Sequence, residues 1–306
     1  MANRRIFYAC NAVGIGNKDG NSIQPVRGAQ TVGINTTFNL EQVFEIGMLG
    51  IYENIENLPN VEVTLEKVLD GHPLIYKLAT ATAASNKLID AAYAECSAIL
   101  TILDDTVEAA TGTPLATVKV TGAVISQVSY AINVEGNGTE QVTLVSNNKT
   151  WSSLWTPTFS PTGVPASASG VVRRQHFDKG ASTFPASIPG GAGAVYQSIR
   201  TSANITREDI FELGSKKPYF KYAKFPVEVT TEFEIIAKTG DQISVIADAK
   251  NLTDETIILA FIDGPTIDLG TKNKLQSANY QGGGTDGSNA TITYSYQTFN
   301  NFTVTP

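Results

Sequence analysis

Hydrophobic and polar residues alternate along two runs of the chain, at positions 32–40 and 198–205. Each run is followed by a short acidic and aromatic segment, a glycine, a loop of roughly a dozen residues, a proline and a second alternating run. Alternation with a period of two is typical of a strand with one buried face. The pattern therefore predicts a strand, a long excursion and a second strand in each half of the chain.

The letters repeat as well as the pattern. EQVFEIG at residues 41–47 and EDIFELG at residues 208–214 lie 167 positions apart and are identical at four of their seven positions. Further matches keep nearly the same offset: Tyr52 with Tyr219, Pro59 with Pro226, and VEVT at 61–64 with VEVT at 227–230. This shared spacing predicts an internal duplication, although strand-forming sequences of similar composition could also match by chance.

Two later stretches, 125–146 and 275–296, alternate on both sides of a glycine-rich turn, which is typical of a β-hairpin. Residues 84–96 instead have apolar side chains at helical spacing, and Ser85 or Asn86 could cap such a helix, so one flanking helix of about three turns is expected there. The expected organisation is a first module at 1–155, a linker or surface excursion rich in Pro, Ser and Gly at 156–195, and a second module at 196–306.

The composition favours a mainly β, β-rich α+β fold. Only 17% of the 306 residues are charged, 42% are hydrophobic, and 26 glycines and 13 prolines suit short strands joined by turns. A net charge of −7 argues against a protein that grips nucleic acid, because such proteins gather Lys and Arg against the phosphates.

Candidate chemistry is sparse along the chain. Cys10, Cys96, His72 and His176 are the only cysteines and histidines, which predicts neither a disulfide framework nor a metal site. The glycine-rich GIGNKDG and GGGTDG stretches lack the context of a phosphate-binding loop and are expected to be turns. Asp104, Asp105 and Asp241 have no evident catalytic partner. We therefore expect no enzyme, no cofactor, no signal peptide and no membrane span.

The two long excursions differ in chemistry. The first, at 48–60, is apolar and acidic, whereas the second, at 215–227, is basic and aromatic. An apolar-acidic surface and an aromatic-basic surface can steer one another into contact, which predicts contacts between subunits or between rings of subunits. The residues expected to make these contacts are Tyr52, Glu53, Glu56, Lys216, Lys217, Tyr219, Lys221, Tyr222 and Lys224. The alternative is that both loops are merely solvated.

Four stretches, at 30–71, 125–151, 205–236 and 289–304, resemble major tail (tail tube) proteins of tailed bacteriophages. The resemblance implies a β-sandwich or partly closed barrel with one flanking helix, whose strands join side by side into rings that stack as a hollow tube. Most such subunits carry one module and form six-membered rings. Two tandem modules here imply a homotrimer that presents six pseudo-equivalent modules.

The resemblance also implies a virion protein made in the host bacterial cytoplasm. Its implied partners are further copies of itself, tape-measure, baseplate or initiator and terminator proteins, and a sheath if the tail has one. Double-stranded DNA would pass a net acidic inner wall without specific binding. Two alternatives remain open: a homohexamer of single-module tube subunits with a decorating second domain, and a β-sandwich receptor- or ligand-binding virion module.

Overall fold

The computed structural model describes residues 6–104, 114–152, 155, 170–250, 252–284 and 289–305. Its secondary structure is mainly β, which confirms the predicted fold class. The described helices are all short: α1 (Ile75–Ala79), α2 (Leu88–Ala91) and the single 3-10 turns η1 (Tyr8–Cys10), η2 (Arg174–His176) and η3 (Gly191–Gly193).

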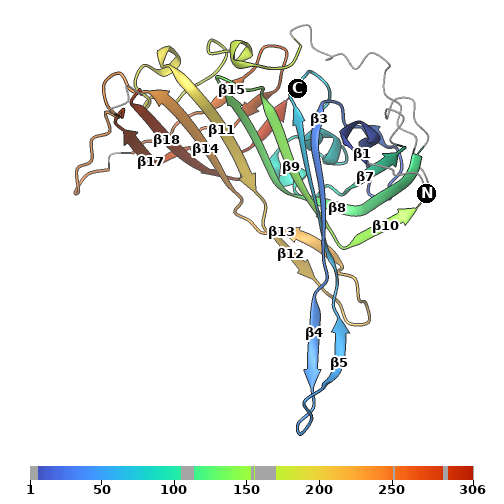
Figure 1. Ribbon diagram of the computed structural model, residues 1–306. Helices are drawn as coiled ribbons and strands as arrows, with labels where there is room; N and C mark the ends of the chain where they lie inside the picture. Colours follow the sequence, from blue (N-terminus) through green and yellow to red (C-terminus); the bar gives the residue numbers. More distant parts are fainter. Residues whose placement is uncertain are drawn as a thin grey trace.

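Eight antiparallel strands form the main sheet, in the order β3, β6, β9, β8, β11, β14, β18, β17 (Figure 1). Their bounds are β3 (Ala29–Thr37), β6 (Asn60–Val68), β9 (Thr139–Ser146), β8 (Pro114–Asn133), β11 (Tyr196–Asn204), β14 (Glu228–Ile236), β18 (Thr291–Phe299) and β17 (Lys274–Gln281). We call β3, β6, β9 and β8 the first strand unit and β11, β14, β18 and β17 the second strand unit. The two units join where β8 pairs with β11.

The second unit repeats the first in the order of its strands, in their pairing register and in the position of a β-bulge. β11 lies 167 residues after β3, and the burial patterns of β9 and β18 agree at all but one of the first eight positions. The ladder between β8 and β9 is interrupted by a bulge between Ile125 and Gln127, and the ladder between β17 and β18 by a bulge between Leu275 and Ser277. Both predicted hairpins, 125–146 and 275–296, are therefore present in equivalent places.

One predicted match is out of register in space. Thr36 pairs with Val61, and its counterpart Ala203 pairs with Val229. Val229, not Val227, therefore stands where Val61 stands, and the repeated VEVT letters are two positions apart in the structure. Because side chains alternate with a period of two, a slip of two residues keeps every side chain on its face and leaves no mark in the hydrophobic pattern.

Other elements cover the core side of the sheet or extend from it. The N-terminal half of β8 leaves the main sheet to pair with β7 and β10, and β7 continues to β1 and β2. The bounds are β1 (Asn11–Asn17), β2 (Gln24–Pro25), β7 (Cys96–Leu103) and β10 (Asn148–Ser152), with β15 (Ile258–Ala260), β16 (Thr266–Asp268) and β19 (Thr303–Thr305) in a separate three-stranded sheet. Two hairpins complete the fold: β4 (Leu40–Phe44) with β5 (Ile51–Glu56), and β12 (Arg207–Ile210) with β13 (Phe220–Ala223).

The helix predicted at 84–96 was too long. Only the single turn α2 forms there. Its N-cap residue is Lys87, which makes no capping hydrogen bond through its side chain. The apolar spacing did identify buried positions, but Cys96 is buried as the first residue of β7 and not on a helix. Helix α1, which the pattern did not predict, lies upstream.

The segment expected to be a linker or surface excursion is described from residue 170 onward. Val172 and Ile188 in it are buried and belong to the same core as the strands. The rings of Phe177 and Phe184 lie against Tyr196 at the start of β11. This segment therefore contributes to the core that both halves share; residues 156–169 lie outside the described part of the chain.

Candidate assembly surfaces

The repeated seven letters encode the same turn twice, once in each hairpin. The amide of Met48 donates to the carbonyl of Glu45, and the amide of Ser215 donates to that of Glu212. Between them Gly47 has φ +92° and Gly214 has φ +90°, a left-handed conformation that strongly favours glycine. We call β4/β5 the first hairpin and β12/β13 the second hairpin. Figure 1 shows both at the same end of the sheet, with the first hairpin projecting furthest.

Both turns present apolar side chains to solvent. Ile46 is 103% and Leu213 is 104% exposed, and Phe44 and Phe211, two positions earlier, are also exposed. The first hairpin adds Phe38, Leu40, Met48, Leu49, Ile51 and Tyr52 to this exposed apolar set. So many exposed apolar side chains on a projecting element are typical of a protein contact.

The structure places the predicted contact residues on these two hairpins, in unequal states. Tyr52, Glu53 and Glu56 lie on β5 and are exposed. On the second hairpin Lys216, Lys217, Tyr219 and Lys224 are exposed, whereas Lys221 and Tyr222 are half-buried.

Two of the predicted lysines already have acidic partners in their own hairpin. The ammonium of Lys221 lies 2.8 Å from a carboxylate oxygen of Asp209, across the β12–β13 ladder. Lys224 lies 3.7 Å from Glu208. Among the described residues, Lys216 and Lys217 in the turn have no such acidic partner and are exposed.

The second hairpin is tied to the first half of the chain. The guanidinium of Arg207 donates to the backbone carbonyls of Ile125 and Ala92, and burial lowers the pKa of this group to about 10. The ring of Tyr93, just after α2, contacts Phe220, Tyr222 and Phe225. The first hairpin has Leu40 in the place of Arg207, and Leu40 is exposed. The two hairpins thus share a turn but not an anchor.

The face of the main sheet that turns away from the core is polar and net acidic. Its positions on β6, β11 and β14 alternate with the buried ones. The charged residues among them are Glu62, Glu66, Arg200, Glu228, Glu232 and Glu234, or five negative charges and one positive. At the end of β17, Lys274 is paired with Asp254 at 2.9 Å. A face of this sign repels phosphate.

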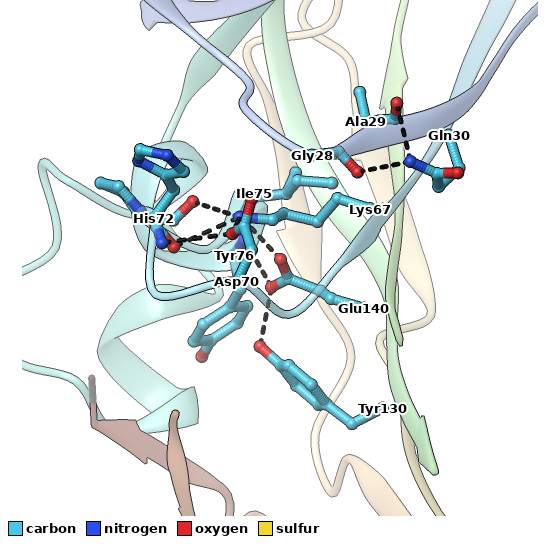
Figure 2. A network of polar contacts seen from close by, with 11 residues as sticks. Gly28, Ala29, Gln30, Lys67, Asp70, His72, Ile75, Tyr76, Tyr130 and Glu140 are labelled. Atoms are coloured by element: carbon cyan, nitrogen blue, oxygen red, sulfur yellow. Dashed lines mark hydrogen bonds and ion pairs between the residues drawn. The ribbon is translucent and has the colours of Figure 1, made fainter. Parts of the chain in front are cut away.

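A buried polar network lies between the first strand unit and α1 (Figure 2). The Glu140 carboxylate accepts hydrogen bonds from the amides of Ile75 and Tyr76 and from the Tyr130 hydroxyl, at 2.7 to 3.0 Å. Burial raises the pKa of Glu140, against these hydrogen bonds. Lys67 is fully buried and donates to Asp70 at 3.0 Å. No local pattern predicts this network, because its members are scattered over 74 positions (67 to 140).

Where the structure describes them, the residues considered for catalysis or metal binding are not brought together. His72 lies in the loop before α1, where its carbonyl accepts from Lys67 and its amide donates to Asp70. Cys10 and Cys96 are buried free thiols, and burial raises the pKa of Cys96 to about 12. Among the described residues, no three His, Cys, Asp or Glu side chains gather as metal ligands would. Asp105 lies outside the described part.

Neither α-helix described here is long and apolar enough to cross a bilayer.

No protein-family model matches the chain, and no curated protein matches it. Among solved structures, a chain from the cryo-EM structure of the anti-feeding prophage (AFP) baseplate, six-fold symmetrised, is similar at 11% identity with a TM-score of 0.37. The similarity covers 50% of this chain and 97% of that chain. A TM-score this low does not establish a shared fold.

Proposed function

We propose that the chain is a non-catalytic structural protein of a tailed-phage virion, which polymerises into stacked rings and forms the hollow tail tube that conducts the genome. One observation carries the proposal: two strand units of the same order lie edge to edge in one continuous sheet. A contact of this kind can be repeated between chains, because a head-to-tail contact repeated by rotation closes into a ring. The resemblance of the sequence to tail tube proteins supports the same function.

The ring we propose is a homotrimer with pseudo-sixfold symmetry. Each chain supplies two strand units, so three chains supply six. The shared order of strands, the shared bulge and the shared glycine turn support a duplicated module. Divergence after duplication accounts for the polar network and the longer hairpin of the first half.

The acidic face of the main sheet is the proposed inner wall. Five glutamates and one arginine on each chain would give this wall a negative potential along its length. DNA would then slide through without sticking, since no cluster of cations is present on these strands to hold its phosphates.

The two hairpins are the proposed contacts between stacked rings. Their exposed apolar turns would be covered by the neighbouring ring, which removes a surface that is otherwise costly in water. Within one ring, Glu53 and Glu56 of one subunit would face Lys216 and Lys217 of its neighbour, which would set the position of the hairpins that contact the next ring. Within the virion the tube would meet tape-measure, baseplate or initiator and terminator proteins, and a sheath along its length if the tail has one.

Assembly of the purified chain tests the proposal. We expect hollow tubes of uniform diameter by negative-stain electron microscopy. In sedimentation, the protein should run as large, fast-sedimenting assemblies and not as monomer. A protein that stays monomeric at all concentrations, and is absent from the tails of particles, would contradict it. High affinity for a surface receptor in that monomer would favour a binding module.

A further inference from the structure

The main sheet ends on two strands whose outer edges are unpaired within the described residues. β3 pairs only with β6, and β17 pairs only with β18. These two strands are not arbitrary ends. β3 is the counterpart of β11, and β17 is the counterpart of β8, and it is β8 and β11 that pair inside the chain. Each outer edge therefore has the partner it needs at the other end of a second copy.

If the chain forms rings as proposed above, we infer that β17 of one copy pairs antiparallel with β3 of the next, in the register that the β8–β11 ladder sets. Counterparts differ by 167 residues between β3 and β11 and by 150 between β8 and β17, as the bulges at Ile125 and Leu275 show. The internal pair Ser202 and Ser129 thus becomes Asn35 (202 − 167) opposite Asn279 (129 + 150). In the same way Ile34 lies opposite Tyr280, and Thr36 opposite Ala278.

The exposure of these strands supports the pairing. Tyr130 on β8 is 3% exposed, whereas its counterpart Tyr280 on β17 is 51% exposed. Likewise Val32 and Ile34 on β3 are less buried than their counterparts Ile199 and Thr201 on β11. The internal strands are covered by one another, so pairing between copies would bury the same positions on β17 and β3.

The composition of the two edges also supports it. Free edges in monomeric proteins are commonly protected by proline or by charged residues, lysine above all, that prevent pairing with another chain. β3 contains no charged residue and no proline, and β17 carries a charge only at its first residue, Lys274. Unprotected edges of eight and nine residues suit strands that are used for pairing.

Engineered cysteines on the full-length chain test the register. Asn35→Cys with Asn279→Cys places two thiols directly opposite each other between copies, on the exposed face of the sheet. Ser129→Cys with Ser202→Cys is the matched internal control, because it occupies the equivalent pair within one chain. Asn35→Cys with Ser277→Cys is the register control, slipped by two residues. The native Cys10 and Cys96 are buried and should not interfere.

After assembly and mild oxidation, the Asn35/Asn279 variant should lose its monomer band on a non-reducing gel and accumulate covalent trimers, whereas the slipped variant should stay monomeric. The internal control should lose both engineered thiols to an internal disulfide and should still run as a monomer on the gel. If tubes form normally but cross-links appear only in the slipped variant, or only in the internal control, the inferred register is wrong. The proposed tube function would not be affected by that result. Failure of the unmodified chain to assemble would overturn the proposed function itself.

Discussion

The two strand units place different chemistry on the same backbone position. In the first unit, Lys67 on β6 lies opposite Glu140 on β9, and both are fully buried. In the second unit the equivalent pair is Ile235 opposite Ile292. A buried polar pair and a buried apolar pair thus support the same sheet geometry. The fold does not need the polar pair, so a local structure must explain it.

Helix α1 is that structure. Its first amides, those of Ile75 and Tyr76, have no partners within the helix, and Glu140 accepts hydrogen bonds from both. Among the described residues, the second half has no helix at this place, and Ile292 packs in the apolar core. A buried polar pair is weak support for stability in general, but removing one member is costly. Here the pair fixes where α1 lies on the sheet.

A second difference separates the inner and outer strands of the sheet. β8 and β11 have neighbours on both sides, whereas β3 and β17 have one each among the strands that the structure describes. The same lysine substitution should therefore act differently at Tyr280 and at Tyr130. At Tyr280 we expect tubes to be abolished while the monomer stays folded, because a lysine can reach solvent in the free chain but not in a closed junction. At Tyr130 the lysine should unfold the chain. Electron microscopy and circular dichroism separate these outcomes.

Tyr280→Phe is the matched control and should still form tubes. If Tyr280→Lys assembles as well as the native chain, β17 does not lie at a subunit junction.

The polar network can be broken on the monomeric Tyr280→Lys background. Glu140→Ala leaves three donors without their acceptor and removes the negative charge opposite the buried Lys67, so we expect a loss of about 3–5 kcal/mol in the free energy of unfolding. Ile292→Val, at the equivalent apolar site, should cost only about 1 kcal/mol. Denaturant titration measures both. Equal and small effects would show that α1 is not held by Glu140.

The anchored and unanchored hairpins can be made alike. Arg207→Ala removes hydrogen bonds to the carbonyls of Ile125 and Ala92, and should lower the local opening free energy of the second hairpin by about 2 kcal/mol. Hydrogen–deuterium exchange should then rise in β12 and β13 toward the rate in β4 and β5. Lys216→Ala, in the exposed turn, is the control. Unchanged exchange in β12 would assign the anchoring to Tyr93 instead.

The smallest effect is expected from the turn charges. Reversing Lys216 and Lys217 to Glu should weaken stacking by roughly 2–5-fold per ion pair, since exposed ion pairs contribute little. Reversing Glu53 and Glu56 to Lys in the same chain should partly restore it, most clearly at low salt. The measured quantity is the critical concentration for tube growth, which rises when stacking is weakened. Lys221 is left unchanged, because its pairing with Asp209 would confound the result. Tubes that grow equally well in all variants would remove these charges from the interface.

Much of the strand arrangement could be predicted from the sequence. Period-two alternation located β3, β6, β11 and β14, and glycine-rich turns located both late hairpins. The repeated EQVFEIG and EDIFELG identified the two equivalent turns, because Gly47 and Gly214 are required by their positive φ.

Long-range features could not be predicted in this way. The pairing of β8 with β11 joins strands from different halves, and neither strand encodes its neighbour locally. The partners of Glu140 and Lys221 are set by tertiary placement, and Cys96 fits a helical pattern although it begins a strand. Each of these depends on contacts that a periodicity does not contain.

Cryo-electron microscopy of the assembled tubes would determine the symmetry of one ring. Two tandem strand units per chain predict threefold symmetry with six wall units, which alternate between a unit bearing α1 and the long first hairpin and a unit without them. Rings with true sixfold symmetry, in which each chain contributes a single wall unit, would contradict the tandem arrangement.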